Sequence, residues 1–124
     1  MLAAGAVAPA AALSATITVN DGGDALANDG KCMVREAVKA ANTDTPSGAA
    51  AGECPAGSGA DTIAFAIPTA TLAIAGVNED ANATGDLDVL AELTFKGAGA
   101  GSTTIAGGKR RPCAGCPARS DGAR

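Results

Sequence analysis

The pattern of apolar and polar positions predicts one helix among several short strands. Residues 16–20 (TITVN) alternate apolar and polar side chains on β-branched residues, which is typical of a short strand. Residues 33–42 (MVREAVKAAN) change to helical spacing, because their apolar side chains recur three and four positions apart on one narrow stripe. The stripe consists of Val34, Ala37, Val38 and Ala41. Off the stripe lie Arg35, Glu36 and Lys39.

Further strands are predicted after a loop over residues 43–59, which is rich in glycine, alanine, serine and proline. They cover residues 61–67, 72–75, 87–90, 93–96 and 103–105. Glycines and a proline separate these strands, and no helical pattern lies between them. Such short strands with tight glycine turns indicate either a β-sandwich or stacked β-coils. Stacked coils bury a continuous core only after several repeats, and about two coils fit before residue 108.

The charge pattern changes abruptly near residue 108. Residues 1–108 contain 4 Lys or Arg and 12 Asp or Glu, a net charge of −8, whereas residues 109–124 have a net charge of +4. The final segment, KRRPCAGCPARSDGAR, also lacks apolar periodicity. We therefore expect an aberrant or disordered basic tail over residues 108–124, from a chain that was cut short or read out of frame.

Composition excludes several classes of function. The chain has no histidine, which rules out Ser-His-Asp triads and imidazole metal ligands. The acidic body argues against binding to nucleic acid. Residues 1–15 (MLAAGAVAPAAALSA) are small and apolar, which is typical of a secretory signal peptide; a disordered alanine-rich leader is the alternative. This segment is too short for a membrane span. Because it is typical of a signal peptide, we expect a secreted or cell-surface protein.

Several blocks in the same order carry a resemblance to a known family. They are residues 32–38 (CMVREAV), 40–42 (AAN), 54–63 (CPAGSGADTI), 84–89 (TGDLDV) and 93–99 (LTFKGAG). Together they resemble the CSLREA-type N-terminal region of secreted right-handed parallel β-helix proteins, from about residue 16 to residue 107. The resemblance implies a mostly β fold: the start of a right-handed parallel β-helix with an N-terminal capping α-helix, between a disordered leader and tail.

The resemblance also implies particular roles for single residues. Cys32 and Cys54 flank the predicted helix and its loop, and the family pattern contains both, so we expect a structural disulfide between them. Met33 replaces a serine that caps the helix in the family, so that half of its capping box is expected to be lost. Ala70 stands where the family has a tyrosine, which removes a large buried group.

Three functions follow from this pattern. The first is a non-catalytic N-terminal cap whose intact parent is structural, or binds polysaccharide or cells as an adhesin. The alternative is a fragment of a β-helix polysaccharide lyase or glycoside hydrolase, with its active site in coils that this chain lacks. The third is a small redox or zinc protein that uses Cys113 and Cys116, although their C-x-x-C motif lies between prolines and has no preceding strand. We expect no cofactor, and we expect the exposed C-terminal β-edge to self-associate.

Three other motifs have structural interpretations that compete with functional ones. Asp86 and Asp88 are weak calcium candidates and, as two carboxylates on one strand, could serve as acid and base about 7 Å apart; solvated acidic turns are the alternative. Residues 97–102 resemble a dinucleotide-binding loop but lack its third glycine and the helix that follows, so a tight turn is expected. Asn82 begins an N-glycosylation sequon.

Overall fold

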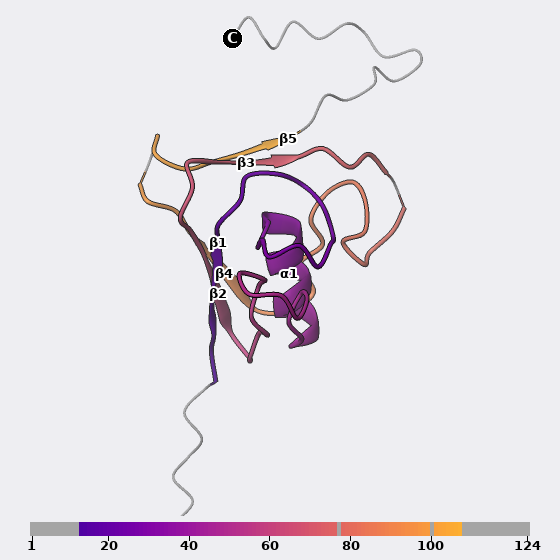
Figure 1. The fold of residues 1–124 in the computed structure, drawn as a ribbon, viewed down its shortest axis with the longest axis vertical. Helices are drawn as coiled ribbons and strands as arrows, with labels where there is room; N and C mark the ends of the chain where they lie inside the picture. The colour runs from indigo at the N-terminus through magenta and orange to yellow at the C-terminus, as the bar shows by residue number, and fades with distance from the viewer. Residues whose placement is uncertain (1–12, 77, 100, 108–124) are drawn as a thin grey trace, which may run out of the picture.

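The computed structural model describes residues 13–76, 78–99 and 101–107, and these form a mostly β domain with one helix (Figure 1). The elements in chain order are β1 (Thr16–Val19), α1 (Val34–Thr43), β2 (Asp61–Phe65), β3 (Thr69–Leu72), β4 (Leu93–Lys96) and β5 (Thr104–Gly107). The predicted signal-like segment lies almost wholly outside the described residues, and the predicted tail lies outside them from residue 108 onward. No helix among the described residues is long and apolar enough to cross a membrane.

The strands form two small parallel sheets that do not close into a barrel. One sheet has the order β1-β2-β4, and the other pairs β3 with β5. In the first sheet Ile17 pairs with Ile63, and Ile63 pairs with Phe95. Large apolar side chains therefore stack in a row across its three strands. In the second sheet Ala70 pairs with Ile105. The two sheets meet at a corner, with α1 lying inside it (Figure 1).

The core lies between the first sheet and the helix. Ile17, Val19 and Ile63 from the sheet are fully buried, as are Val34 and Val38 from α1. Residues on alternate strand positions face the core, which is the period expected for a sheet with one buried face. Ala70 is also fully buried, in agreement with the inward position expected for it.

The helix is more buried than its apolar stripe indicates. The charged side chains of Arg35 and Glu36 lie off the stripe, yet these residues are only 0% and 2% exposed, whereas Lys39 is exposed. The cause is that connecting segments cover the side of the helix that the sheets leave open. Gly57 marks one close approach: a Cβ there would lie 2.7 Å from Cα of Ala41, so only glycine lets this segment pack against the helix.

The start of α1 partly corrects the expectation for the capping box. The backbone N–H of Met33 donates to the Glu36 carboxylate at 3.1 Å, so the glutamate half of the box is present. The Met33 side chain occupies the other capping position, opposite the Glu36 amide, but it makes no conventional cap hydrogen bond. The sulfur of a thioether is a weak hydrogen-bond acceptor, so Met33 caps the Glu36 amide more weakly than a serine would.

Two strand predictions were wrong. Residues 87–90 form no strand, and the strand expected over residues 72–75 lies three residues earlier, as β3. In both places side chains of other segments bind the backbone groups that a strand would use: Asn82 binds both backbone groups of Asp88, and Asp24 binds the amides that follow β3. The other predicted strands are found, with shifts of up to two residues at their ends.

Candidate functional site

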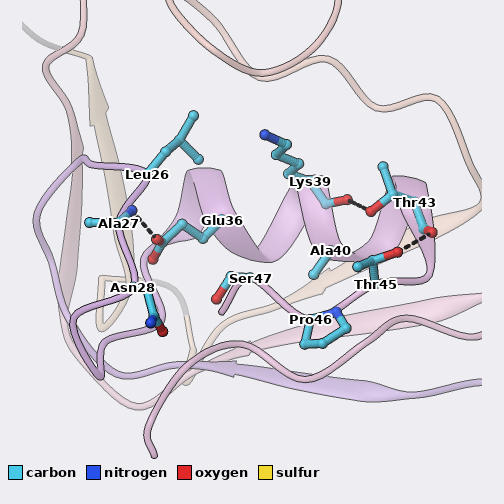
Figure 2. Close-up of a pocket in the computed structure, with 10 residues that line it drawn as sticks. All are labelled: Leu26, Ala27, Asn28, Glu36, Lys39, Ala40, Thr43, Thr45, Pro46 and Ser47. Atoms are coloured by element: carbon cyan, nitrogen blue, oxygen red, sulfur yellow. Dashed lines mark hydrogen bonds between the residues drawn. The ribbon is translucent and has the colours of Figure 1, made fainter. Parts of the chain in front are cut away.

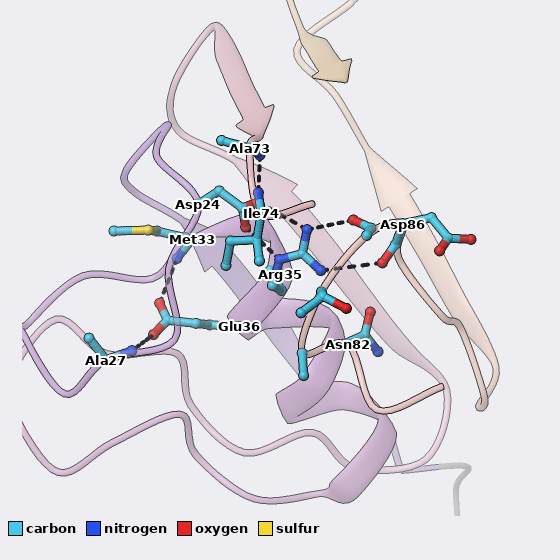
Figure 3. Close-up of polar contacts among 12 residues, drawn as sticks. Asp24, Ala27, Met33, Arg35, Glu36, Ala73, Ile74, Asn82 and Asp86 are labelled. Carbon is cyan, nitrogen blue, oxygen red and sulfur yellow. Dashed lines mark hydrogen bonds and ion pairs between the residues drawn. The ribbon is translucent and has the colours of Figure 1, made fainter. Parts of the chain in front are cut away.

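The most highly connected polar group in the described domain is a buried ion pair between Arg35 and Asp24 (Figure 3). Nε of Arg35 donates to Oδ1 of Asp24 at 2.6 Å, and Nη2 donates to Oδ2 at 2.9 Å. Both side chains are fully buried. This bidentate geometry between planar guanidinium and carboxylate groups is the strongest form of protein ion pair.

Each member of the pair also binds backbone groups of distant segments. Arg35 donates to the carbonyl oxygen of Gly85 at 2.7 Å and to that of Asp86 at 3.3 Å. Asp24 accepts from the amides of Ala73 and Ile74 at 2.6 and 2.8 Å. The pair therefore joins α1, the loop before it, the end of β3 and the loop before β4. Its donors and acceptors are used by the fold, so the pair is structural and offers no free group for catalysis.

The electrostatic balance of Asp24 favours its charged form. Burial alone raises the pKa of this carboxyl, but the Arg35 hydrogen bond and the amides of Ile74 and Ala73 outweigh burial and hold the pKa below its ordinary value. Because a depressed pKa stabilises the folded state above the ordinary value of 3.8, we expect this contribution to be lost as the pH falls below it.

Glu36 shows the opposite balance. Burial raises the pKa of its carboxyl, although the amides of Ala27 and Met33 donate to the carboxylate at 2.9 and 3.1 Å and oppose the change. A raised pKa means that the folded state binds this proton more tightly than the unfolded state. The contribution of Glu36 to stability is therefore greatest below its ordinary pKa of 4.5 and is lost as the pH rises through the folded-state value.

Replacing Glu36 with glutamine tests this balance. Glutamine has one acceptor oxygen in place of two, so either the Ala27 or the Met33 amide loses its partner, and we expect a loss of about 1–3 kcal/mol near neutral pH. The variant also lacks the titration, so its difference from the parent should grow as the pH is lowered toward 4. Urea unfolding at several pH values measures both effects. A difference that is independent of pH would contradict the raised pKa of Glu36.

A shallow pocket of about 320 Å³ lies beside the helix, between α1 and the loops on either side of it (Figure 2). Its lining residues are Leu26, Ala27, Asn28, Glu36, Lys39, Ala40, Thr43, Thr45, Pro46 and Ser47. The polar groups drawn there mostly bond to one another or to the backbone: Glu36 binds Ala27, and the Thr43 hydroxyl donates to the carbonyl of Lys39 at 2.8 Å. The Ser47 hydroxyl donates to Oε2 of Glu53 at 2.6 Å, and this hydrogen bond lowers the pKa of the Glu53 carboxyl, which makes that carboxylate a poor base.

The calcium candidates Asp86 and Asp88 lie in a loop, not on a strand. Asp86 is exposed, and Asp88 is partly buried, with Oδ2 covered and without a hydrogen-bond partner. Burial, followed by the neighbouring charges of Asp86, Glu79 and Asp80, raises the pKa of the Asp88 carboxyl. Among the described residues no three Asp, Glu, Cys or His side chains gather as metal ligands. The prediction that Asp86 and Asp88 share a strand face, on which the acid–base role depended, is therefore wrong. Calcium binding by these two residues stays a prediction.

Asn82 has a structural role that sequence alone did not reveal. It is 1% exposed, its Oδ1 accepts from the Asp88 amide and its Nδ2 donates to the Asp88 carbonyl, both at 2.7 Å. Asn42 on α1 binds the same loop through the Asp88 carbonyl and the Leu90 amide. The nitrogen that would carry a glycan is thus buried and bonded in the folded protein.

We therefore expect Asn82 to carry no glycan in folded protein secreted from a glycosylating eukaryotic host. Intact-mass measurement of the folded fraction checks this, and a Thr84→Ala variant, which removes the sequon while keeping Asn82, provides the control. The two proteins should differ only by the mass of the substitution. A glycan on Asn82 in protein that unfolds cooperatively would show that this loop can open without loss of the fold.

The two cysteine pairs and the glycine-rich segment have separate outcomes. Cys32 and Cys54 form the predicted disulfide, with their Cα atoms 4.7 Å apart and both residues buried, and this confirms the prediction. Cys113 and Cys116 lie outside the described residues. In the glycine-rich segment after β4 the amide of Ser102 donates to the carbonyl of Gly99 at 2.9 Å, which is the tight turn that was expected.

Sequence reasoning missed the partners of Arg35 and Glu36, because these contacts join residues that lie far apart along the chain. One signal was available: Arg35 is one of only four basic residues before residue 109 and lies in a helix with an apolar stripe. Comparison with known proteins adds no further identification. A scan of known family models, a search of curated proteins and a search of solved structures each found no match to this chain.

Proposed function

We propose that residues 16–107 form the N-terminal cap and first coils of a right-handed parallel β-helix, with a structural and non-catalytic role. The observation that carries this proposal is the order in which the chain visits its two sheets. It passes from β2 in the first sheet to β3 in the second, and then from β4 in the first to β5 in the second. Thr94 pairs with Thr62, 32 residues earlier, and Thr104 pairs with Thr69, 35 residues earlier. The coils of a parallel β-helix follow a path of this kind, and right-handed crossovers are the rule for parallel strands.

The position of α1 supports the capping role. The helix packs against β1, β2 and β3, the earlier strands of the two sheets. The loop before the helix adds to this cover, since the carbonyl of Gly22 accepts from the amide of Thr71 at 2.9 Å. A cap of this kind protects the first strands from pairing with other chains. It also fits the resemblance to β-helix N-terminal regions.

The disulfide and the signal-like segment support export of the parent protein. Disulfides persist in oxidising compartments, and the Cys32–Cys54 bridge ties the segment before α1 to the loop after it. We therefore propose a secreted or cell-surface protein. Its further coils would present a long β-face to polysaccharide or to other cells, as an adhesin-like binding module.

The test is to sequence the coding DNA from codon 104 onward and to translate all three frames. We expect another frame to continue short strands, separated by glycines, at intervals close to the 32 and 35 residues found here. The extended protein should then bind a polysaccharide array that residues 16–124 alone do not bind. If no frame continues the pattern, the proposal that this chain caps a longer β-helix fails.

A further inference from the structure

The last strand of each sheet has a free edge. β4 ends the three-stranded sheet and β5 ends the two-stranded sheet, and no strand among the described residues pairs with their outer sides. Both strands are four residues long. An unpaired strand edge presents a row of N–H and C=O groups that readily pair with another strand. The domain therefore has two free edges of equal length, one on β4 and one on β5.

The side chains next to these edges form an apolar groove. Phe95 pairs in register with the buried Ile63, and Ile105 with the buried Ala70, so both occupy core-facing positions. They are nevertheless 40% and 41% exposed. Phe95 also stacks on Phe65, with ring centroids 6.4 Å apart. The groove is lined by Phe65, Phe95, Gly97, Gly99, Thr103 and Ile105, none of which is charged.

The path of the chain at this end favours a second copy of the same protein. The chain enters the corner along β4, turns, and leaves it along β5 (Figure 1). A half-turn about an axis through the corner exchanges these two arms and reverses their directions. It therefore places β4 of one copy antiparallel to β5 of the other, and makes the same pairing a second time. Gly97 and Gly99 leave little side-chain bulk where the two corners would meet.

The absence of charge in the groove also favours self-association. A twofold interface places each patch against its own copy, so a charged lining would repel itself. The sequence up to residue 108 has a net charge of −8, yet the groove lining is neutral and apolar. A negatively charged polysaccharide or a basic partner has no complementary charge to bind here, whereas a second apolar groove does.

We propose that this chain forms a twofold dimer through its open end, with β4 of each copy paired antiparallel to β5 of the other. Phe95 of one copy then packs against Ile105 of the other, and both leave water. The proposal goes beyond the capping function and concerns the chain of 124 residues, because in the longer parent proposed above the next coil would cover the same edges. Because the groove has six lining residues, compared with about 20–30 residues per partner in a standard interface, we expect dissociation in the micromolar range or weaker.

The first test is sedimentation of the full chain over a concentration range that extends to about 1 mM, set by the weak affinity expected for a small interface. We expect the apparent mass to rise with concentration for the parent and for Leu90→Glu, and to stay monomeric for Phe95→Glu. Leu90 is the matched control, because it is 67% exposed and lies outside the groove. A parent chain that stays monomeric throughout, or a Leu90→Glu variant that also loses the dimer, would overturn the proposal.

The second test identifies which strands meet. Phe95→Cys and Ile105→Cys are made separately in a chain whose Cys113 and Cys116 are replaced by serine, and the two proteins are mixed and oxidised. Antiparallel pairing of β4 with β5 predicts a disulfide-linked dimer that forms mainly in the mixture. Dimers of Phe95→Cys alone would instead show β4 against β4, and no crosslink at all would also overturn the arrangement. Neither result affects the coding-DNA test of the capping function.

Discussion

An Arg35→Met variant is expected to lose about 3–5 kcal/mol of unfolding free energy, the cost of removing one partner from a buried ion pair. Asp24 would stay buried without its guanidinium partner, and the carbonyls of Gly85 and Asp86 would lose their donor. This is a large fraction of the stability of a small domain, so the variant is expected to be partly unfolded at 37 °C. Urea unfolding followed by circular dichroism measures the loss.

Lys39→Met provides the matched control, because it also replaces a basic side chain with methionine, on an exposed position of the same helix. It should change the unfolding free energy by less than about 0.5 kcal/mol. Removing both charges, in an Asp24→Leu and Arg35→Met double variant, should not restore stability, since the amides of Ala73 and Ile74 would then lack an acceptor. A double variant as stable as the parent would show that the ion pair does not hold these loops.

Removing the Cys32–Cys54 bridge is expected to cost about 3 kcal/mol, from the entropy that the unfolded chain regains when a loop of this size opens. The two cysteines lie 22 residues apart and are buried, so a Cys32→Ala and Cys54→Ala double variant avoids leaving reactive thiols in the core. Urea unfolding of the variant and the parent, both without reductant, measures the difference. Equal midpoints would mean that packing of the 43–60 segment against α1, and not the bridge, fixes the loop.

The elements with a clear local pattern could be predicted from the sequence. The β-branched run at residues 16–19, the helical stripe from Val34 and the LTFK segment at residues 93–96 each form the expected element. In each case the local residue preferences and the tertiary environment favour the same structure. The Cys32–Cys54 bridge was predicted from the family resemblance; the comparisons with known proteins found no match.

The errors arose where distant side chains decide the backbone conformation. The apolar segment at residues 72–75 has the composition of a strand, but Asp24 binds the amides of Ala73 and Ile74 and ends β3 at Leu72. The LDVL segment at residues 87–90 also has strand composition. Its backbone instead binds the side chains of Asn82 and Asn42. Asn82 is six residues from Asp88, but Asp24 and Asn42 lie 46 to 50 residues from the groups that they bind, and local propensity cannot detect such distant partners.

The Arg35 contacts also constrain the order of folding during synthesis. The arginine emerges early, but the carbonyls that it binds belong to Gly85 and Asp86, about 50 positions later in the chain. A nascent chain that stops before these residues can form the helix but cannot neutralise and bury its guanidinium group. Such non-local contacts delay folding. The N-terminal part of the domain is therefore expected to pack fully only after β2, β3 and the loop before β4 have been made.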